Sequence, residues 1–189
     1  MGQIQQAKLV KFMVAILAIE EDILPVAREL VTQRLGTIDL ISPVWPFTSS
    51  KYYAKEMSET LLRQFVSLAQ PGDPAGIIDL KLASNSAELF DAQNRNRPQR
   101  RAINLDPGYI TPAKLVLATT KDYSHRVYLG RGIYAEAALH YHAGAWHAWS
   151  WTYPDYTVST YHDFFVQVRN RLLEQLRAEA DCGLDIRSK

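Results

Sequence analysis

Two short stretches of the chain carry most of the side chains that could do chemistry. Residues 104–109 read Asn-Leu-Asp-Pro-Gly-Tyr, and residues 119–126 read Thr-Thr-Lys-Asp-Tyr-Ser-His-Arg. Together they place carboxylates, cations, a histidine and several hydroxyls around one short apolar segment, residues 113–118. A surface loop does not need so many functional groups beside a buried element, so this region is the candidate site.

The first stretch combines a strand with a turn signal. Residues two apart in a strand share a face, so Asn104 and Asp106 are expected to point the same way at the end of a strand over residues 101–105. Pro107-Gly108 is then expected to turn the chain and let the backbone approach a ligand. The alternative is an ordinary Asp-Pro-Gly turn in which Asp106 bonds only the backbone.

The second stretch suits an anionic ligand. Arg126 can hold a phosphate or carboxylate through two parallel hydrogen bonds, while Lys121 acts as a point charge. His125 is the natural general acid or base near neutral pH, and Asp122 or Asp106 would orient it. The alternative is an exposed loop whose charges pair weakly with their neighbours.

Glu136 lies in an otherwise apolar strand, where a carboxylate must face a water-filled cleft or be paired. Tyr134 shares its strand face. Glu136 and Asp106 together would suit Mg²⁺ or Mn²⁺, which prefer oxygen ligands. His140 and His142 would form a second metal pair, although two histidines at a wet sheet edge are the commoner arrangement.

The candidate residues therefore fall into three roles. The catalytic candidates are His125, Asp106, Asp122 and Glu136. The substrate-binding candidates are Asn104, Lys121, Arg126, Ser124, Tyr134 and Lys81, the last at the end of an expected strand. The metal candidates are Asp106 and Glu136, and further candidates are Tyr52, Tyr53, Glu56, Asn85, Tyr153 and Asp155.

Composition indicates one globular domain. The chain has 189 residues and a net charge of +1, which gives no general attraction to nucleic acid or an anionic membrane. We expect a single domain over 1–189, with an ordered core over about 8–178 and a frayed tail over 179–189. The arginine-rich segment 95–101 reads as a solvated loop.

Localisation is inferred from what the chain contains. Cys182 is the single cysteine, which excludes an internal disulfide and a cysteine zinc site. No secretory leader is evident at the N-terminus, and the apolar run 12–19 is too short to span a bilayer. We therefore expect a cytoplasmic protein; the oligomeric state is left open.

Hydrophobic periodicity predicts an α+β domain. The expected strands are 9–19, 37–44, 77–83, 101–105, 127–129, 133–142 and 145–152, and the expected helices are 23–35, 53–68, 86–92, 111–119 and 161–176. Residues 45–47 read as a turn, and Gly130-Arg131-Gly132 reads as a hairpin. This order favours a twisted mixed or antiparallel sheet with helices mainly on one face, a ferredoxin-like core with additions. A three-layer α/β sheet is the alternative.

Several motifs together resemble a prokaryotic family known as a domain of unknown function. They are Val44-Trp-Pro-Phe47, the stretch 104–109, the stretch 114–126, Gly132-Ile-Tyr-Ala-Glu136 and Trp151-Thr-Tyr-Pro-Asp-Tyr156. Some relatives carry the label "GTP-binding protein". The chain lacks a phosphate-binding loop, however, and Asp122 lies one place too early for the guanine-reading Thr-Lys-x-Asp pattern.

These observations favour a small enzyme, a hydrolase or group transferase, that acts on a phosphorylated or carboxylated small molecule such as a nucleotide. No redox cofactor motif is present. The alternative is a non-catalytic ligand-binding or protein-interaction module that uses the same polar pocket.

Overall fold

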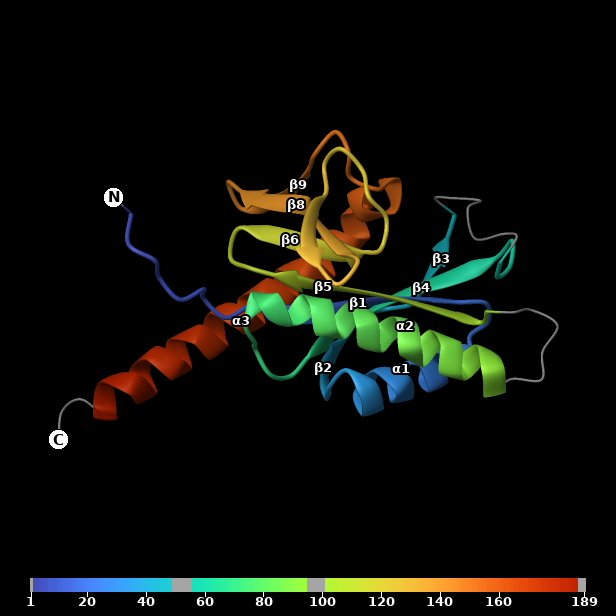
Figure 1. Ribbon diagram of the computed structural model, residues 1–189, viewed down its shortest axis with the longest axis horizontal. Coiled ribbons are helices and arrows are strands. Elements are labelled where there is room, and N and C mark those ends of the chain that lie inside the picture. The colour runs from blue at the N-terminus through green and yellow to red at the C-terminus, as the bar shows by residue number, and fades with distance from the viewer. Residues whose placement is uncertain (1, 49–55, 95–100, 187–189) are drawn as a thin grey trace.

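The computed structural model describes residues 2–48, 56–94 and 101–186 (Figure 1). The elements follow in the order β1 (Lys11–Ala18), α1 (Ile23–Arg34), β2 (Ile38–Ile41), β3 (Trp45–Phe47), β4 (Leu61–Leu68), the 3-10 turn η2 (Pro74–Gly76), α2 (Ile77–Asn94), β5 (Ile103–Ile110), β6 (Lys114–Thr119), β7 (Val127–Gly130), β8 (Ile133–His142), β9 (Ala145–Ala148), the 3-10 turn η3 (Pro154–Thr157) and α3 (Ser159–Ile186).

The strands form one antiparallel sheet in the order β2-β4-β1-β5-β6-β8-β7, with β3 on the edge of β4 and β9 on the edge of β8. The first half, β2-β4-β1-β5 with α1 and α2, has the split βαβ arrangement of a ferredoxin-like core. The expected α+β class with a ferredoxin-like core and additions is therefore confirmed. The additions are the edge strand β3, the strands β6 to β9 and the helix α3.

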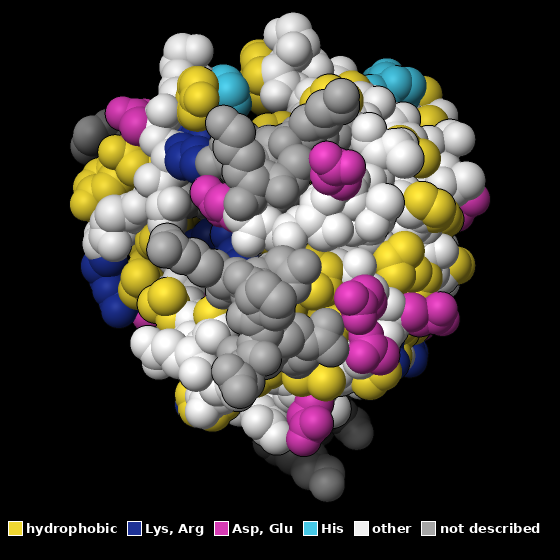
Figure 2. Space-filling view, turned by 90° about the vertical axis from the view of Figure 1, so that its right-hand side faces the viewer, with side chains coloured by type: hydrophobic (Ala, Val, Ile, Leu, Met, Phe, Trp, Pro, Cys, Tyr) yellow, Lys and Arg dark blue, Asp and Glu magenta, His cyan; other side chains and the backbone are white. Residues whose placement is uncertain are grey.

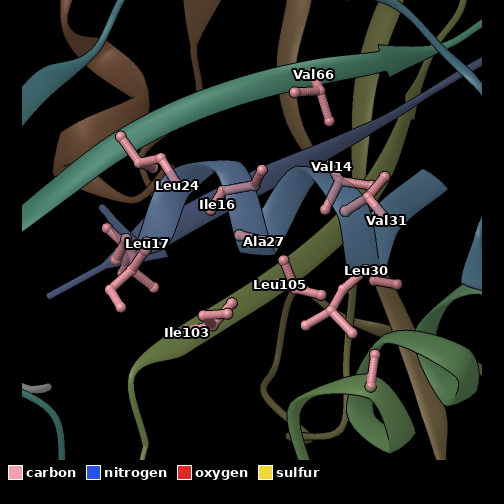
Figure 3. Packing of buried hydrophobic residues seen from close by; sticks show 14 of the residues in the cluster. Val14, Ile16, Leu17, Leu24, Ala27, Leu30, Val31, Val66, Ile103 and Leu105 are labelled. Carbon is pink, nitrogen blue, oxygen red and sulfur yellow. The ribbon is translucent and has the colours of Figure 1, made fainter. Parts of the chain in front are cut away.

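Two hydrophobic layers cover the two faces of the sheet. On one face, β1 contributes Val14 and Ile16, which pack against Ala27 and Val31 of α1 (Figure 3). On the other face, Met13 and Ala15 of β1 lie in a second cluster with the apolar side of α3, which consists of Tyr161, Phe164, Phe165 and Val168. Because strand residues alternate between faces, one strand supplies both layers. The helices α1 and α2 share the first face, and α3 covers the second.

Lys11 is the unexpected residue of the central strand, because its side chain is fully buried. Its ammonium donates to Asp39 Oδ2 at 2.6 Å and to the Ala69 carbonyl at 3.0 Å. From α3, Arg171 lies 3.6 Å from the same Asp39 oxygen, and Gln175 donates to the same Ala69 carbonyl at 2.7 Å. Burial is the main cause that lowers the pKa of Lys11, against the hydrogen bond to Asp39. This network joins α3 to the sheet.

Two predicted elements in the middle of the chain are wrong. The helix expected over 53–68 is strand β4 from residue 61 onward, and its earlier part includes residues outside the described ranges. The strand expected over 77–83 and the helix over 86–92 form one helix, α2. Because β4 is buried on both faces, its sequence lacks the alternation that identifies a strand, and three apolar residues fall at helical spacing by chance.

Three predictions around the candidate site also need correction. Pro107-Gly108 does not turn the chain, because β5 continues through both residues to Ile110. The helix expected over 111–119 is the strand β6, which forms a hairpin with β5. Residues 45–47 form the edge strand β3 and not a turn.

The remaining predicted strands, helices and hairpin match the structure in kind, but α3 continues to Ile186 through most of the tail that was expected to be frayed from residue 179. The β7–β8 hairpin turns through Gly130, Arg131 and Gly132, all with positive φ as expected for a tight turn. The strand β9 is shorter than expected. Among the described residues, no helix has the length and apolar character needed to cross a membrane.

Candidate functional site

A cavity of about 530 Å³ lies between α2, the start of β5, the end of β6 and the segment around η3. Among the described residues, its wall holds five basic side chains, Arg63, Lys81, Arg101, Lys121 and Arg126, and five acidic ones, Glu56, Glu88, Asp106, Glu136 and Asp155. On the side of the molecule shown in Figure 2, Lys and Arg side chains lie next to Asp and Glu side chains. A cavity with so many convergent charges is the strongest candidate for a functional site.

The cavity exists because β5 and β6 separate. β5 pairs with β1 along its whole length, but with β6 only through residues 108–110. In an antiparallel strand, every second residue directs its backbone N–H and C=O to the same neighbouring strand. Pro107 occupies a position whose backbone faces β6, and proline has no N–H to donate there. The two strands lie close together at Gly108, where an added Cβ would lie 2.4 Å from the Val116 carbonyl oxygen. The residues before Pro107 therefore leave β6 and present an open strand edge.

Side chains of α2 complete this open edge. The Leu105 N–H donates to Glu88 Oε1 at 2.6 Å, and the Lys81 ammonium donates to the Leu105 carbonyl at 3.3 Å. Lys81 and Glu88 are two helical turns apart and therefore share one face of α2. Without these partners the buried N–H and C=O of Leu105 would have no hydrogen bond. The polar side chains of α2 therefore replace the β6 backbone as the partners of β5 at this position.

A continuous hydrogen-bond network runs along this side of the cavity. Lys81 donates to Asp106 Oδ1 at 3.0 Å, and Asn104 Nδ2 donates to Asp106 Oδ2 at 2.6 Å. Arg101 donates through Nη2 both to Asn104 Oδ1 and to Glu88 Oε2. Asn104 and Asp106 thus lie on one face of β5, as expected, and two cations alternate with two carboxylates.

The two carboxyl groups of this network have pKa values shifted in opposite directions. Burial raises the pKa of Glu88 to about 7, although Arg101 and Lys81 act to lower it and Asp106 adds to the rise. Burial would also raise the pKa of Asp106, but the charge and hydrogen bond of Lys81, with Arg63 and Asn104, outweigh it and hold this pKa below its usual value. Near neutral pH, Asp106 is therefore ionised while Glu88 is poised between its two forms.

The opposite wall is organised by Arg126. Its Nε donates to Glu136 Oε2 at 2.7 Å, its Nη1 to the Lys121 carbonyl at 3.0 Å, and its Nη2 to the Tyr153 hydroxyl at 2.7 Å. The guanidinium also lies over the Tyr123 ring, 4.7 Å from its centre. Burial lowers the pKa of Arg126, but the hydrogen bonds to Glu136 and Tyr153 outweigh it and raise this pKa. Arg126 therefore fixes the loop 121–126, strand β8 and the segment before η3 relative to one another.

A buried ion pair connects the two walls. Arg63 of β4 donates to Asp155 of η3 at 2.7 Å, and both side chains are less than one tenth exposed. The Arg63 guanidinium also lies 5.0 Å from the ring centre of Phe47 and 5.5 Å from that of Phe65. Burial raises the pKa of Asp155 because desolvation outweighs the attraction of Arg63. The pair is accordingly a geometric link more than a source of stability.

Six of the residues that were assigned a catalytic, substrate-binding or metal role from the sequence lie at the cavity wall: Lys81, Asn104, Asp106, Lys121, Arg126 and Glu136. Four of the further candidates, Glu56, Asn85, Tyr153 and Asp155, line it as well, whereas Tyr52 and Tyr53 lie outside the described residues. His125 does not line the cavity. It lies behind Glu136, where its Nε2 is 2.9 Å from Glu136 Oε2 and its ring stacks on Trp151. Asp122 and Ser124 are exposed outside the cavity, and Tyr134 packs against Tyr128.

Sequence reasoning missed Glu88 and Arg63 and set Arg101 aside as part of a solvated loop. One signal was present for Glu88. Lys81, Asn85 and Glu88 lie four and three residues apart, the spacing of one helix face, and form a polar stripe within residues 77–94. The division of this segment into a strand and a short helix concealed the stripe. Arg63 lies in the strand that was taken for a helix, where no such signal exists.

The residues do not fit the expected metal site. Both oxygens of Asp106 accept hydrogen bonds, from Lys81 and Asn104, and Glu136 is paired with Arg126. Within the described ranges, no group of three or more His, Cys, Asp and Glu side chains could hold a metal ion, and this includes the region of His140. Asp106 and Glu136 are therefore each paired with a cationic side chain and, in this arrangement, do not form the expected Mg²⁺ or Mn²⁺ site.

Comparisons with known proteins identify the family. No curated protein and no solved structure matches the chain. A family model described as "Domain of unknown function (DUF4416)" matches residues 8–172, which is most of the sequence and includes every charged residue of the cavity wall. The chain therefore belongs to the DUF4416 family, as its motifs indicated.

Proposed function

We propose that this protein is a small enzyme that binds an anionic small molecule in the cavity and uses Glu88 as a general acid and base. The observation that carries the proposal is the pair Glu88 and Asp106. They belong to one hydrogen-bond network at the cavity wall, and their pKa values are displaced in opposite directions. Paired carboxyls with divided pKa values are the arrangement that acid–base enzymes use.

The anion would bind at the basic side chains of the wall. An ammonium group has three protons to donate, and Lys81 uses two of them, on Leu105 and Asp106, among the described residues. The third can serve a phosphate or carboxylate oxygen. Lys121 lines the same cavity and adds a second positive charge. Asp106 would keep Lys81 charged and oriented.

The pKa of about 7 suits Glu88 for proton transfer at neutral pH. In a hydrolysis or group transfer, the ionised carboxylate would accept the proton of the attacking water or hydroxyl as the new bond forms. The same carboxyl would then return that proton to the leaving group as the old bond breaks. Phosphorylated and carboxylated compounds, nucleotides included, are the substrate class, and the cytoplasm is the expected compartment.

The second candidate is a non-catalytic ligand-binding module. Five ion pairs are described among the residues of the wall, and each places a cation beside a carboxylate. Such an arrangement also suits a pre-organised binding pocket. The two functions differ in what Glu88 does after the ligand binds. In a binding module its ionisation changes affinity, whereas in an enzyme it limits the rate.

The test combines binding with turnover for a panel of phosphate monoesters, nucleotides and carboxylate esters, using calorimetry and product release by NMR. Lys81→Met should weaken binding of the ligand at least tenfold, because it removes a buried ammonium contact. Glu88→Gln keeps the side-chain volume and should retain binding but lose at least a hundredfold in kcat. Wild-type turnover should rise with pH and level off above about 7.

The matched control is Glu59→Gln, because Glu59 is exposed and does not line the cavity. It should change neither binding nor turnover. Binding without turnover, or unchanged kcat in Glu88→Gln, would favour the binding module. Unchanged affinity in Lys81→Met would remove the cavity from consideration for either function.

A further inference from the structure

The Arg126–Glu136 pair is not the two-point contact that its chemistry allows. Adjacent Nε and Nη2 protons of an arginine can bind both oxygens of one carboxylate in parallel. Here Nε donates to Glu136 Oε2, but Nη2 donates to the Tyr153 hydroxyl. Glu136 Oε2 also contacts His125 at 2.9 Å. One oxygen of Glu136 therefore has two partners, and Tyr153 takes the place of the other.

The second oxygen, Glu136 Oε1, is buried and has no hydrogen-bond partner among the described residues. The side chain of Glu136 is 1% exposed, and Glu136 belongs to the cavity wall. A buried carboxylate oxygen without a donor is unfavourable, and native proteins leave few such atoms unless a ligand or water completes them. The cavity is the space from which such a partner would come.

The surrounding charges define the group that fits. The charges of Arg126 and Glu136 cancel, so the part of the cavity beside this pair is neutral and remains so when a neutral donor binds. An ammonium group there would be repelled by the Arg126 guanidinium. Tyr153 accepts from Arg126, and its own proton has no acceptor within the described part of the chain. The cavity therefore offers one acceptor here, Glu136 Oε1, and one donor, the Tyr153 hydroxyl. A hydroxyl group or a carboxamide of a ligand can bind both.

We propose that Glu136 Oε1 and the Tyr153 hydroxyl form a subsite that selects ligands with a neutral hydrogen-bond donor, a hydroxyl or an amide N–H, in addition to their anionic group. This inference rests on the proposed anion site at Lys81 and specifies its substrate class. Arg126 is the positioning residue, since its two adjacent donors hold both members of the subsite.

Three phosphate esters of similar shape test the subsite by calorimetry. They are 2-hydroxyethyl phosphate, which has a donor, 2-methoxyethyl phosphate, which has only an acceptor, and propyl phosphate, which has neither. The wild type should bind the hydroxyl compound about tenfold tighter than the other two, because only its O–H can complete Glu136 Oε1. Lys81→Met should weaken all three, which shows that they occupy the cavity.

Two variants should remove the discrimination by different routes. In Glu136→Gln the side-chain oxygen must face Arg126, so an N–H₂ group faces the cavity, and the hydroxyl and methoxy compounds should bind equally. In Tyr153→Phe the freed Arg126 donor can bind Glu136 Oε1, and the preference for the hydroxyl compound should fall in the same way. Because Tyr153 is 44% exposed, this variant should fold even where Glu136→Gln does not. The control Glu59→Gln should retain the tenfold preference.

The outcomes separate this inference from the function on which it rests. Equal wild-type affinity for the three esters, with loss of all binding in Lys81→Met, would overturn the donor subsite and leave the anion site in place. A tenfold preference that survives in both Glu136→Gln and Tyr153→Phe would also overturn it. If the wild type binds none of the three esters, the anion site and the subsite both fail.

Discussion

The raised pKa of Glu88 makes a quantitative prediction about folding stability. An acid whose pKa is higher in the folded state holds more protons when folded, so stability is fully present below the unfolded pKa and is lost as the pH rises through the folded pKa. For Glu88 these values are 4.5 and about 7. At about 1.4 kcal/mol per pKa unit, the wild type should lose about 3 kcal/mol over this range through Glu88 alone.

The variant Glu88→Gln isolates this contribution, because glutamine cannot ionise while the other titrating groups remain. Urea unfolding of both proteins between roughly pH 4 and 8.5, a range that spans both pKa values of Glu88, gives the difference in unfolding free energy. That difference should shift by about 3 kcal/mol in favour of Glu88→Gln as the pH rises. An NMR titration of the Glu88 carboxyl carbon should give a midpoint near 7. A constant difference across the range, or a midpoint near 4.5, would refute the argument.

Two further predictions concern the scaffold and are measured by urea unfolding. Asp39→Ala leaves the fully buried Lys11 without its carboxylate and should cost about 3–5 kcal/mol, whereas Lys11→Met removes the buried charge itself and should cost clearly less. Gly108→Ala places a Cβ against the backbone of Val116 and should cost more than about 2 kcal/mol, whereas Gly144→Ala meets no atom and should cost about 1 kcal/mol for its positive φ.

The elements predictable from the sequence are those with a clear period or a clear end. The apolar run of β1, the stripe of α1 ended by Gly36, the Gly-Arg-Gly hairpin and the amphipathic α3 all have such signals. β4 and α2 do not. β4 is buried on both sides and shows no alternation, while the polar residues of α2 serve the cavity and interrupt its apolar pattern. The polar side chains that α2 presents to the cavity, Lys81, Asn85 and Glu88, therefore obscured its secondary structure.

The candidate site was predictable to the extent that its residues are close in sequence. Asn104 and Asp106 were placed on one strand face by a period of two. Arg126 was recognised as an anion-binding residue of the polar stretch 119–126, and Glu136 by its charge in an otherwise apolar strand. The partners of these residues come from distant elements, as with Glu88 on α2, and only the sheet topology brings them together. The strand was expected to end at Pro107-Gly108, but β5 continues through both residues and stays paired with β1, and only its pairing with β6 stops there.

The cavity belongs to neither half of the fold alone. The ferredoxin-like core contributes Lys81 and Asp106, which pair with each other, and the additions contribute Arg126 and Glu136, which also pair with each other. Among the ion pairs described for the wall, only Arg63 with Asp155 joins the core to the additions. Desolvation makes this buried pair a weak source of stability. Its physical role is geometric, because the pair sets the separation of the two walls. An enzyme with its anion-binding group on the core and its donor subsite on the additions would need that separation to be fixed.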